Sequence, residues 1–339
     1  MKHKWCLYAA GTMFLAGCTD STSVQNFART APPEAQYDAL LLDHAGMLSL
    51  EPDVSAIESQ APIDTTMVPA SAAAFCANIP ALARSHAALI AYMKSLGDAA
   101  TAGTTIAPAR TYKPPSVPEA EATPATCPPT FIPVDVSTAA AVAGAPAPNG
   151  KPLVTAADLS ADLQKTSSAG IKISKAEADA AAALIVLIEN AATASAREAA
   201  VKADLDQGRA GFKATISIET QAMDYVADEA DSYRNSLTNL RKSVENGITS
   251  PHPSPAAQSI GIRFLLASYP AGPLANAEQA RQIAAAAKAY LKALKNISDA
   301  FDKIDSAANS GNALTPATWT TIQPLISQAV AAYQDLAKL

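Results

Sequence analysis

The side chains of this chain most able to transfer protons or bind metals are histidines and carboxylates, and few are suitably spaced. His86 falls on the apolar face of a helical pattern, where a core histidine and a catalytic base are both possible and the core role is commoner. Asp224, Asp228 and Asp231 share one helix face, but carboxylates on a rigid helix rarely enclose calcium. We therefore predict a solvated acidic face, no metal site, no cofactor and no catalytic residue.

Aromatic residues at helical spacing are the second set of candidates. Tyr233, Tyr290 and Trp319 could line a pocket for a small ligand or a partner surface. An aromatic residue on the apolar face of a helix is more often part of the core, so both interpretations stay open.

Two cysteines in the body of the chain could form a covalent link. Cys76 and Cys127 have no neighbouring Cys-x-x-Cys or histidine pair that would indicate a zinc site. In an oxidising compartment two such thiols most often pair, and two buried free thiols are the alternative. We predict a Cys76–Cys127 disulfide.

The amino terminus has the features of an export signal. Lys2 and Lys4 precede an apolar stretch from Trp5 to Ala16, which is shorter than the roughly 20 residues that span a bilayer. The stretch ends in the string Leu15-Ala16-Gly17-Cys18. This string resembles the lipobox of the bacterial lipoprotein class.

The resemblance implies that residues 1–17 are removed and that the thiol of Cys18 accepts a diacylglyceryl group. It also implies acylation of the new amino terminus by a fatty acid such as palmitate. Several acyl chains, at about 0.8 kcal/mol per buried CH2, would anchor the protein permanently in a membrane. Because Thr19 rather than aspartate follows Cys18, analogy with lipoprotein sorting favours the outer membrane over the inner membrane, with the body facing the periplasm.

Composition limits the choice of partners. The 339 residues carry a formal net charge of −6 and no basic cluster interleaved with aromatics, so we expect no nucleic-acid partner. The longest apolar run, Ala180 to Ile188, is too short to span a membrane and favours a buried helix.

Helical periodicity dominates the rest of the chain. Apolar residues follow the alternating three- and four-residue spacing of a helix face in three segments, around 79–96, 223–244 and 283–304. Such spacing predicts helices packed nearly antiparallel. Ser174–Glu177 fits a capping box, and we expect the helix it opens to run to about Leu205 with Gly208 as its stop. The alternation at 212–218 has no partner strand and is assigned to helix or loop.

The predicted fold is therefore an all-α, alanine-rich antiparallel bundle of six to eight helices with an amino-terminal lipid anchor. Its expected parts are the signal peptide 1–17, a flexible tether 18–36, an N-terminal helical segment 37–104, a proline-rich insertion 105–153 and a C-terminal helical bundle 154–339. The insertion is assigned because eleven of the 24 prolines lie between Thr105 and Pro152.

The expected function is that of a non-enzymatic binding or scaffold component of the cell envelope, with another envelope protein as partner. The alternative is a carrier of a small apolar ligand held between helices. An enzyme built on His86 or on the acidic face is the least favoured possibility.

Overall fold

The computed structural model of this protein describes eight helices and, within the ranges given next, no strand. The described residues are 21–32, 34–59, 70–101, 156–166, 171–191, 198–249, 273–310 and 316–336. The helices are α2 (Ser21–Ala28), α3 (Glu34–Ser59), α4 (Ala70–Thr101), α6 (Ala156–Lys165), α7 (Lys175–Ala191), α8 (Glu198–Thr249), α10 (Pro273–Asn309) and α11 (Pro316–Leu336). The all-α prediction is confirmed.

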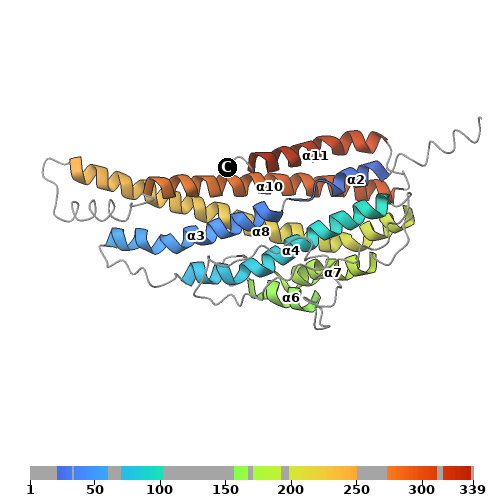
Figure 1. The fold of residues 1–339 in the computed structure, drawn as a ribbon, viewed down its shortest axis with the longest axis horizontal. Helices are drawn as coiled ribbons and strands as arrows, with labels where there is room; N and C mark the ends of the chain where they lie inside the picture. Colours follow the sequence, from blue (N-terminus) through green and yellow to red (C-terminus); the bar gives the residue numbers. More distant parts are fainter. Residues whose placement is uncertain are drawn as a thin grey trace, which may run out of the picture.

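The long helices α8 and α10 form the axis of an elongated bundle (Figure 1). Helix α8 has 52 residues, which corresponds to about 78 Å at 1.5 Å per residue. Ion pairs from Arg209 to Asp305 and from Asp231 to Lys288 run in opposite chain directions, so the two helices are antiparallel. The apolar faces predicted from periodicity point into the core, as Met223 and Tyr290 illustrate with no exposed surface.

Helix α4 crosses the bundle antiparallel to α8 and continues through Pro80. Pro80 therefore lies inside this helix rather than at one of its ends. The predicted apolar face of α4 is fully buried, and it includes His86 among its aliphatic residues.

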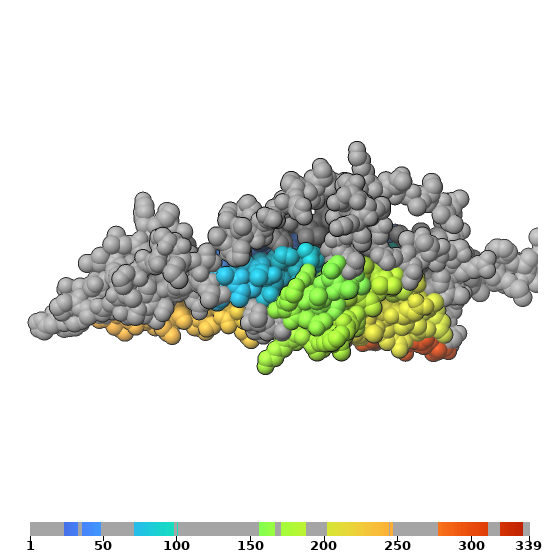
Figure 2. Space-filling model, turned by 90° about the horizontal axis from the view of Figure 1, so that it is seen from below, coloured from blue at the N-terminus to red at the C-terminus, as the bar shows by residue number. Residues whose placement is uncertain are grey.

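Helices α6 and α7 lie side by side on α4 and α8, and Figure 2 shows them together on one face of the molecule. The predicted capping box opens α7: the Glu177 amide donates to the Ser174 hydroxyl (3.2 Å), and the Ser174 amide donates to the Glu177 carboxylate (2.9 Å). Helix α7 ends at Ala191 rather than near Leu205.

Gly208, predicted as a helix stop, lies inside α8. A Cβ at this position would collide with the ring and hydroxyl of Tyr92 on α4. The glycine therefore serves close helix packing, and a sequence pattern does not distinguish this role from a C-terminal cap. The alternating segment 212–218 is also helical and belongs to α8.

The flexible tether predicted for residues 18–36 is wrong from Ser21 onward. Residues Ser21–Ala28 form α2, and its Val24 and Phe27 are buried in the core. Phe27 packs against Phe301 and Phe212, with ring centroids about 6 Å apart. At the start of the N-terminal helical segment, residues Glu34–Ser59 form one helix, α3, which continues through Pro52. Residues 1–20 and the proline-rich insertion 105–153 lie outside the described residues.

Candidate functional site

Five helices bring polar side chains together in the middle of the bundle. The residues are Tyr37 of α3, His86 of α4, Glu219 of α8, Tyr290 of α10 and Tyr333 of α11. Each lies on the inward face of its helix, because the helical period that aligns the neighbouring apolar residues also aligns these residues. We name these five residues the central polar cluster.

Glu219 is the acceptor at the centre of this cluster. The Tyr290 hydroxyl donates to Oε2 of Glu219 at 2.8 Å, and Nδ1 of His86 lies 3.0 Å from Oε1. Nδ1 of His86 also lies 3.1 Å from the Tyr290 oxygen. Because the Tyr290 hydroxyl donates its proton to Glu219, the His86 proton is assigned to Nδ1. There it can be donated to Oε1 of Glu219 and to the Tyr290 oxygen. The side chains of His86 and Glu219 have no exposed surface.

Aromatic rings close the cluster on its two remaining sides. The ring of Tyr37 stacks on the His86 imidazole, with centroids 4.3 Å apart and planes inclined by 20°. Tyr333 packs against Tyr290 with centroids 6.0 Å apart. Burial, together with the nearby carboxylate of Glu219, raises the pKa of Tyr37, Tyr290 and Tyr333 well above the usual value. The three phenols are therefore neutral, and among the described residues the Tyr290 hydroxyl donates a hydrogen bond whereas those of Tyr37 and Tyr333 have no partner.

Two further polar residues of α3 are buried beside this cluster. Asp38 is 1 % exposed, and neither of its carboxylate oxygens has a hydrogen-bond partner in the described part of the chain. Burial raises the pKa of Asp38 to about 6, an effect that His86 partly opposes. His44 lies between Phe75 and Tyr225, and burial lowers its pKa to about 3.

The geometry of the central polar cluster suits a structural role more than chemistry on a substrate. A histidine oriented by a carboxylate is also the arrangement of a general base. Here the pair is enclosed by packed side chains and a tyrosine hydroxyl occupies the second carboxylate oxygen, so a substrate has no access in this conformation. The hydrogen bonds instead hold α4, α8 and α10 in one register, as buried polar groups do in coiled coils.

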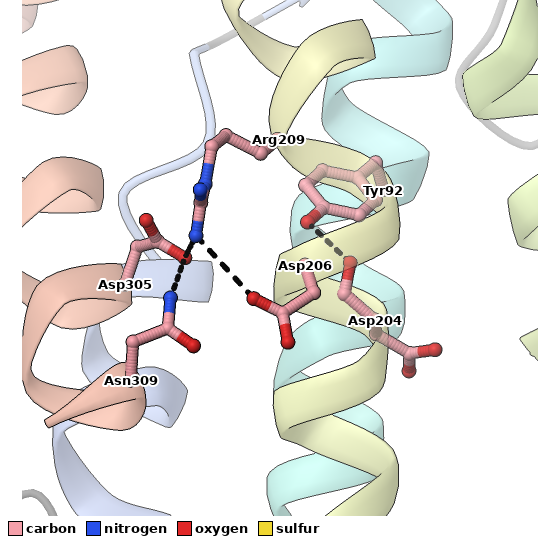
Figure 3. A network of polar contacts seen from close by, with 6 residues as sticks. All are labelled: Tyr92, Asp204, Asp206, Arg209, Asp305 and Asn309. Atoms are coloured by element: carbon pink, nitrogen blue, oxygen red, sulfur yellow. Dashed lines mark hydrogen bonds and ion pairs between the residues drawn. The ribbon is translucent and has the colours of Figure 1, made fainter. Parts of the chain in front are cut away.

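A second polar network joins helices near the end of the bundle that contains α2 (Figure 3). Arg209 of α8 bridges Asp305 of α10 at 2.7 Å and Asp206 at 3.3 Å, and Asn309 donates to the same Asp305 oxygen. The Tyr92 hydroxyl donates to the backbone carbonyl of Asp204 at 3.0 Å. This network ties α4, α8 and α10 together where α2 packs on them.

Two of the grooves along the described helices are open to solvent. One, between α6 and α7, has a volume of about 540 Å³ and is crossed by the Ser160–Asp179 hydrogen bond of 2.5 Å. The other, between α3 and α10, has a volume of about 220 Å³ and is lined partly by Gln36, Asp43 and Gln282. Neither groove includes a residue of the central polar cluster.

The aromatic residues proposed from the sequence do not form one surface. Tyr290 belongs to the central polar cluster, Tyr233 is 6 % exposed in the core, and Trp319 is half-buried on α11. His86, for which a core role and a catalytic role were both open, lies in the core. On the acidic face Asp224 and Asp228 are exposed, and Asp231 pairs with both Lys288 and Arg234.

Of the cysteines predicted to be modified or paired, Cys18 and Cys127 lie outside the described residues. Cys76 lies on α4, and its expected partner Cys127 lies outside the described ranges, so the pairing of these two residues stays a prediction. Within the described helices, no group of three or more histidine, cysteine, aspartate or glutamate residues could hold a metal ion.

Glu219, Asp38 and the tyrosines Tyr37 and Tyr333 were not among the residues predicted from the sequence. One signal for Glu219 was present: continuing the apolar face of α8 four residues back from Met223 reaches it. A charged residue at such a position indicates a buried partner. The sequence does not identify that partner, because His86 is 133 positions away.

Comparison with protein family models, curated proteins and solved structures gives no match for this chain. In the described part of the chain no helix has the length and apolar character needed to cross a membrane.

Proposed function

We propose that the mature protein is a lipid-anchored, non-enzymatic binding or scaffold component of a bacterial cell envelope. In this proposal Cys18 carries the lipid, the outer membrane holds the acyl chains, and the body meets another envelope protein on the periplasmic side. The support combines the lipobox-like string with one structural observation, which is the position of α2.

Helix α2 connects the expected anchor to the rigid core over a short distance. Ser21, its first residue, is three positions after Cys18, and three extended residues span about 10 Å. Val24 and Phe27 are buried, and the Gln25 side chain donates to the Ala100 carbonyl at 3.1 Å. Lipid on Cys18 would therefore hold one end of the bundle close to the membrane surface.

The bundle extends away from that end. Phe301, near the carboxyl end of α10, packs on Phe27, while the amino-terminal end of α10 lies at the opposite end of the molecule (Figure 1). The 37 residues of α10 correspond to about 55 Å. Such a body would present helix faces well above the lipid headgroups, where another envelope protein can be bound.

The anchor is tested with Cys18→Ser and with Cys6→Ser as the matched control in the signal segment. Incorporation of labelled palmitate and flotation with membranes are expected for the unaltered chain and for Cys6→Ser, and both are lost in Cys18→Ser. If Cys18→Ser still takes up label and floats with membranes, the proposed anchor is wrong.

The binding role is tested separately by photo-cross-linking in intact cells. Val186 and Val330 are the large apolar side chains exposed among the described residues, so a photoreactive residue is placed at each. The exposed Lys295 position is the control. We expect a discrete cross-linked envelope protein from at least one valine position. If neither valine position differs from the control, these faces do not bind a partner.

A further inference from the structure

Helix α3 carries most of the buried polar atoms that lack partners. Ten buried side-chain atoms have no hydrogen-bond partner among the described residues, and six of them belong to Gln36, Tyr37, Asp38 and His44 of α3. Each such atom gives up water on burial and gains no hydrogen bond in return. These unfavourable terms therefore concentrate on a single helix.

The interactions that join the other helices do not reach α3. The interhelical ion pairs of arginine and lysine in the described ranges connect α4 to α6 through Arg84 and Asp162, and α8 to α10 through Arg209, Lys213 and Lys288 with their carboxylate partners. Helix α3 is held instead by apolar side chains such as Leu41 and Leu48 and by ring contacts.

Beneath α3 the bundle presents aromatic and polar surface. Tyr37 covers His86 and lies 5.3 Å from Tyr290, while His44 covers Phe75 and Tyr225. Movement of α3 away from the bundle would uncover these side chains and give water access to the central polar cluster. The rest of the bundle keeps its own contacts between α4, α8 and α10.

We propose that α3 is a releasable helix, which opens as a local unit ahead of the remaining bundle. Its opening uncovers the side chains of His86, Phe75, Tyr225 and Tyr290 on α4, α8 and α10. Helix α3 thus closes one side of the central polar cluster and also carries most of the buried polar atoms that lack partners. Local opening of this kind is a known property of elements with few stabilising contacts.

The titratable groups around Asp38 and His44 define how opening depends on each residue. Asp38 faces His86 of α4, with Tyr37 beside it and Glu219, Tyr290 and Tyr333 beyond. His44 faces the rings of Phe75 and Tyr225. Above its pKa of about 6, the buried carboxyl of Asp38 is ionised without a partner, which favours opening. Below the ordinary pKa of histidine, burial keeps His44 neutral although water would protonate it, so acid pH favours opening at this residue.

The test is hydrogen exchange of backbone amides, followed by mass spectrometry of the full mature chain at pH 7.5 and pH 4.5. Protection of peptides from 34–48 is compared with protection of peptides from 210–230 in α8. We expect α3 to be at least about 100-fold less protected than α8 at both pH values, which is the contrast typical of local opening. Equal protection of the two helices would overturn the proposal.

Substitutions separate this proposal from ordinary fraying. Asp38→Asn removes the ionisation cost and is expected to raise α3 protection roughly 10- to 100-fold at pH 7.5, with a smaller effect at pH 4.5. His44→Phe keeps a ring in the same place and is expected to act more strongly at pH 4.5 than at pH 7.5. The exposed Asp43→Asn on the same helix is the control.

The two variants test the proposal independently of each other. If Asp38→Asn folds and leaves α3 protection at pH 7.5 within about threefold of the control, the buried carboxylate does not drive opening. If Asp38→Asn does not fold, His44→Phe decides by the same comparison at pH 4.5. Protection that rises equally in α3 and α8 would also overturn local release, since it indicates only global unfolding.

Discussion

Removing the central acceptor of the polar cluster should destabilise the bundle strongly. Glu219→Ala leaves the Tyr290 hydroxyl buried without its acceptor and leaves the Nδ1–H group of His86 with the Tyr290 oxygen as its one acceptor among the described residues. A buried donor left without its acceptor costs about 1–3 kcal/mol, and the cavity left by the shortened side chain adds to this loss. We expect a loss of that size in the free energy of unfolding, measured by urea titration of the helical circular dichroism signal.

A double-mutant cycle with Tyr290→Phe isolates the hydrogen bond itself. In the unaltered protein this substitution removes the hydrogen bond to Glu219 and the contact with His86 Nδ1, and it should cost about 1–2 kcal/mol. In the Glu219→Ala background the hydroxyl keeps only the contact with His86 Nδ1, so the effect of the same change should be clearly smaller. The exposed Asp228→Asn on the same helix should stay within about 0.5 kcal/mol of the starting protein.

The result that refutes this reasoning is additivity. If Tyr290→Phe costs the same with and without Glu219, the hydrogen bond of 2.8 Å contributes nothing to stability and the cluster does not act as a unit. A loss well below about 2 kcal/mol for Glu219→Ala would indicate that water reaches the site.

Three further predictions concern packing, capping and covalent structure. Gly208→Ala should lower the free energy of unfolding by about 1–3 kcal/mol through its collision with Tyr92, although alanine is the better helix former; a higher melting temperature would contradict it. Ser174→Ala should cost about 1 kcal/mol at pH 7. Because Ser174 lowers the pKa of Glu177, the contribution of that carboxylate is lost as pH falls through its folded pKa, so the urea midpoint should differ less at pH 3. Non-reducing peptide mapping should yield a Cys76–Cys127 peptide, and reduction of this loop should cost roughly 4 kcal/mol; a free thiol at Cys127 would exclude the pairing.

Local patterns were sufficient to predict most of the helices. The apolar faces of α8 and α10 follow from residue spacing alone, because a period of 3.6 residues aligns apolar side chains whatever they later contact. The capping box of α7 was predictable for the same reason, since both of its partners lie within four residues.

The errors arose where a residue's role depends on distant contacts. Residues Ser21–Ala28 are polar enough to look like a tether, yet Phe27 is buried because Phe212 and Phe301 complete its site. Gly208 looks like a helix stop, and only the presence of Tyr92 makes it an interior residue.

By itself, the sequence determined the helical class, the faces that point inward and the string at Cys18 that resembles a lipid-attachment site. Only the tertiary structure decided that His86 meets Glu219 and Tyr290, and that Asp38 and His44 are buried without partners. The physical reason is range: periodicity and capping act within a few residues, whereas the pairing of buried polar groups depends on which helices pack together.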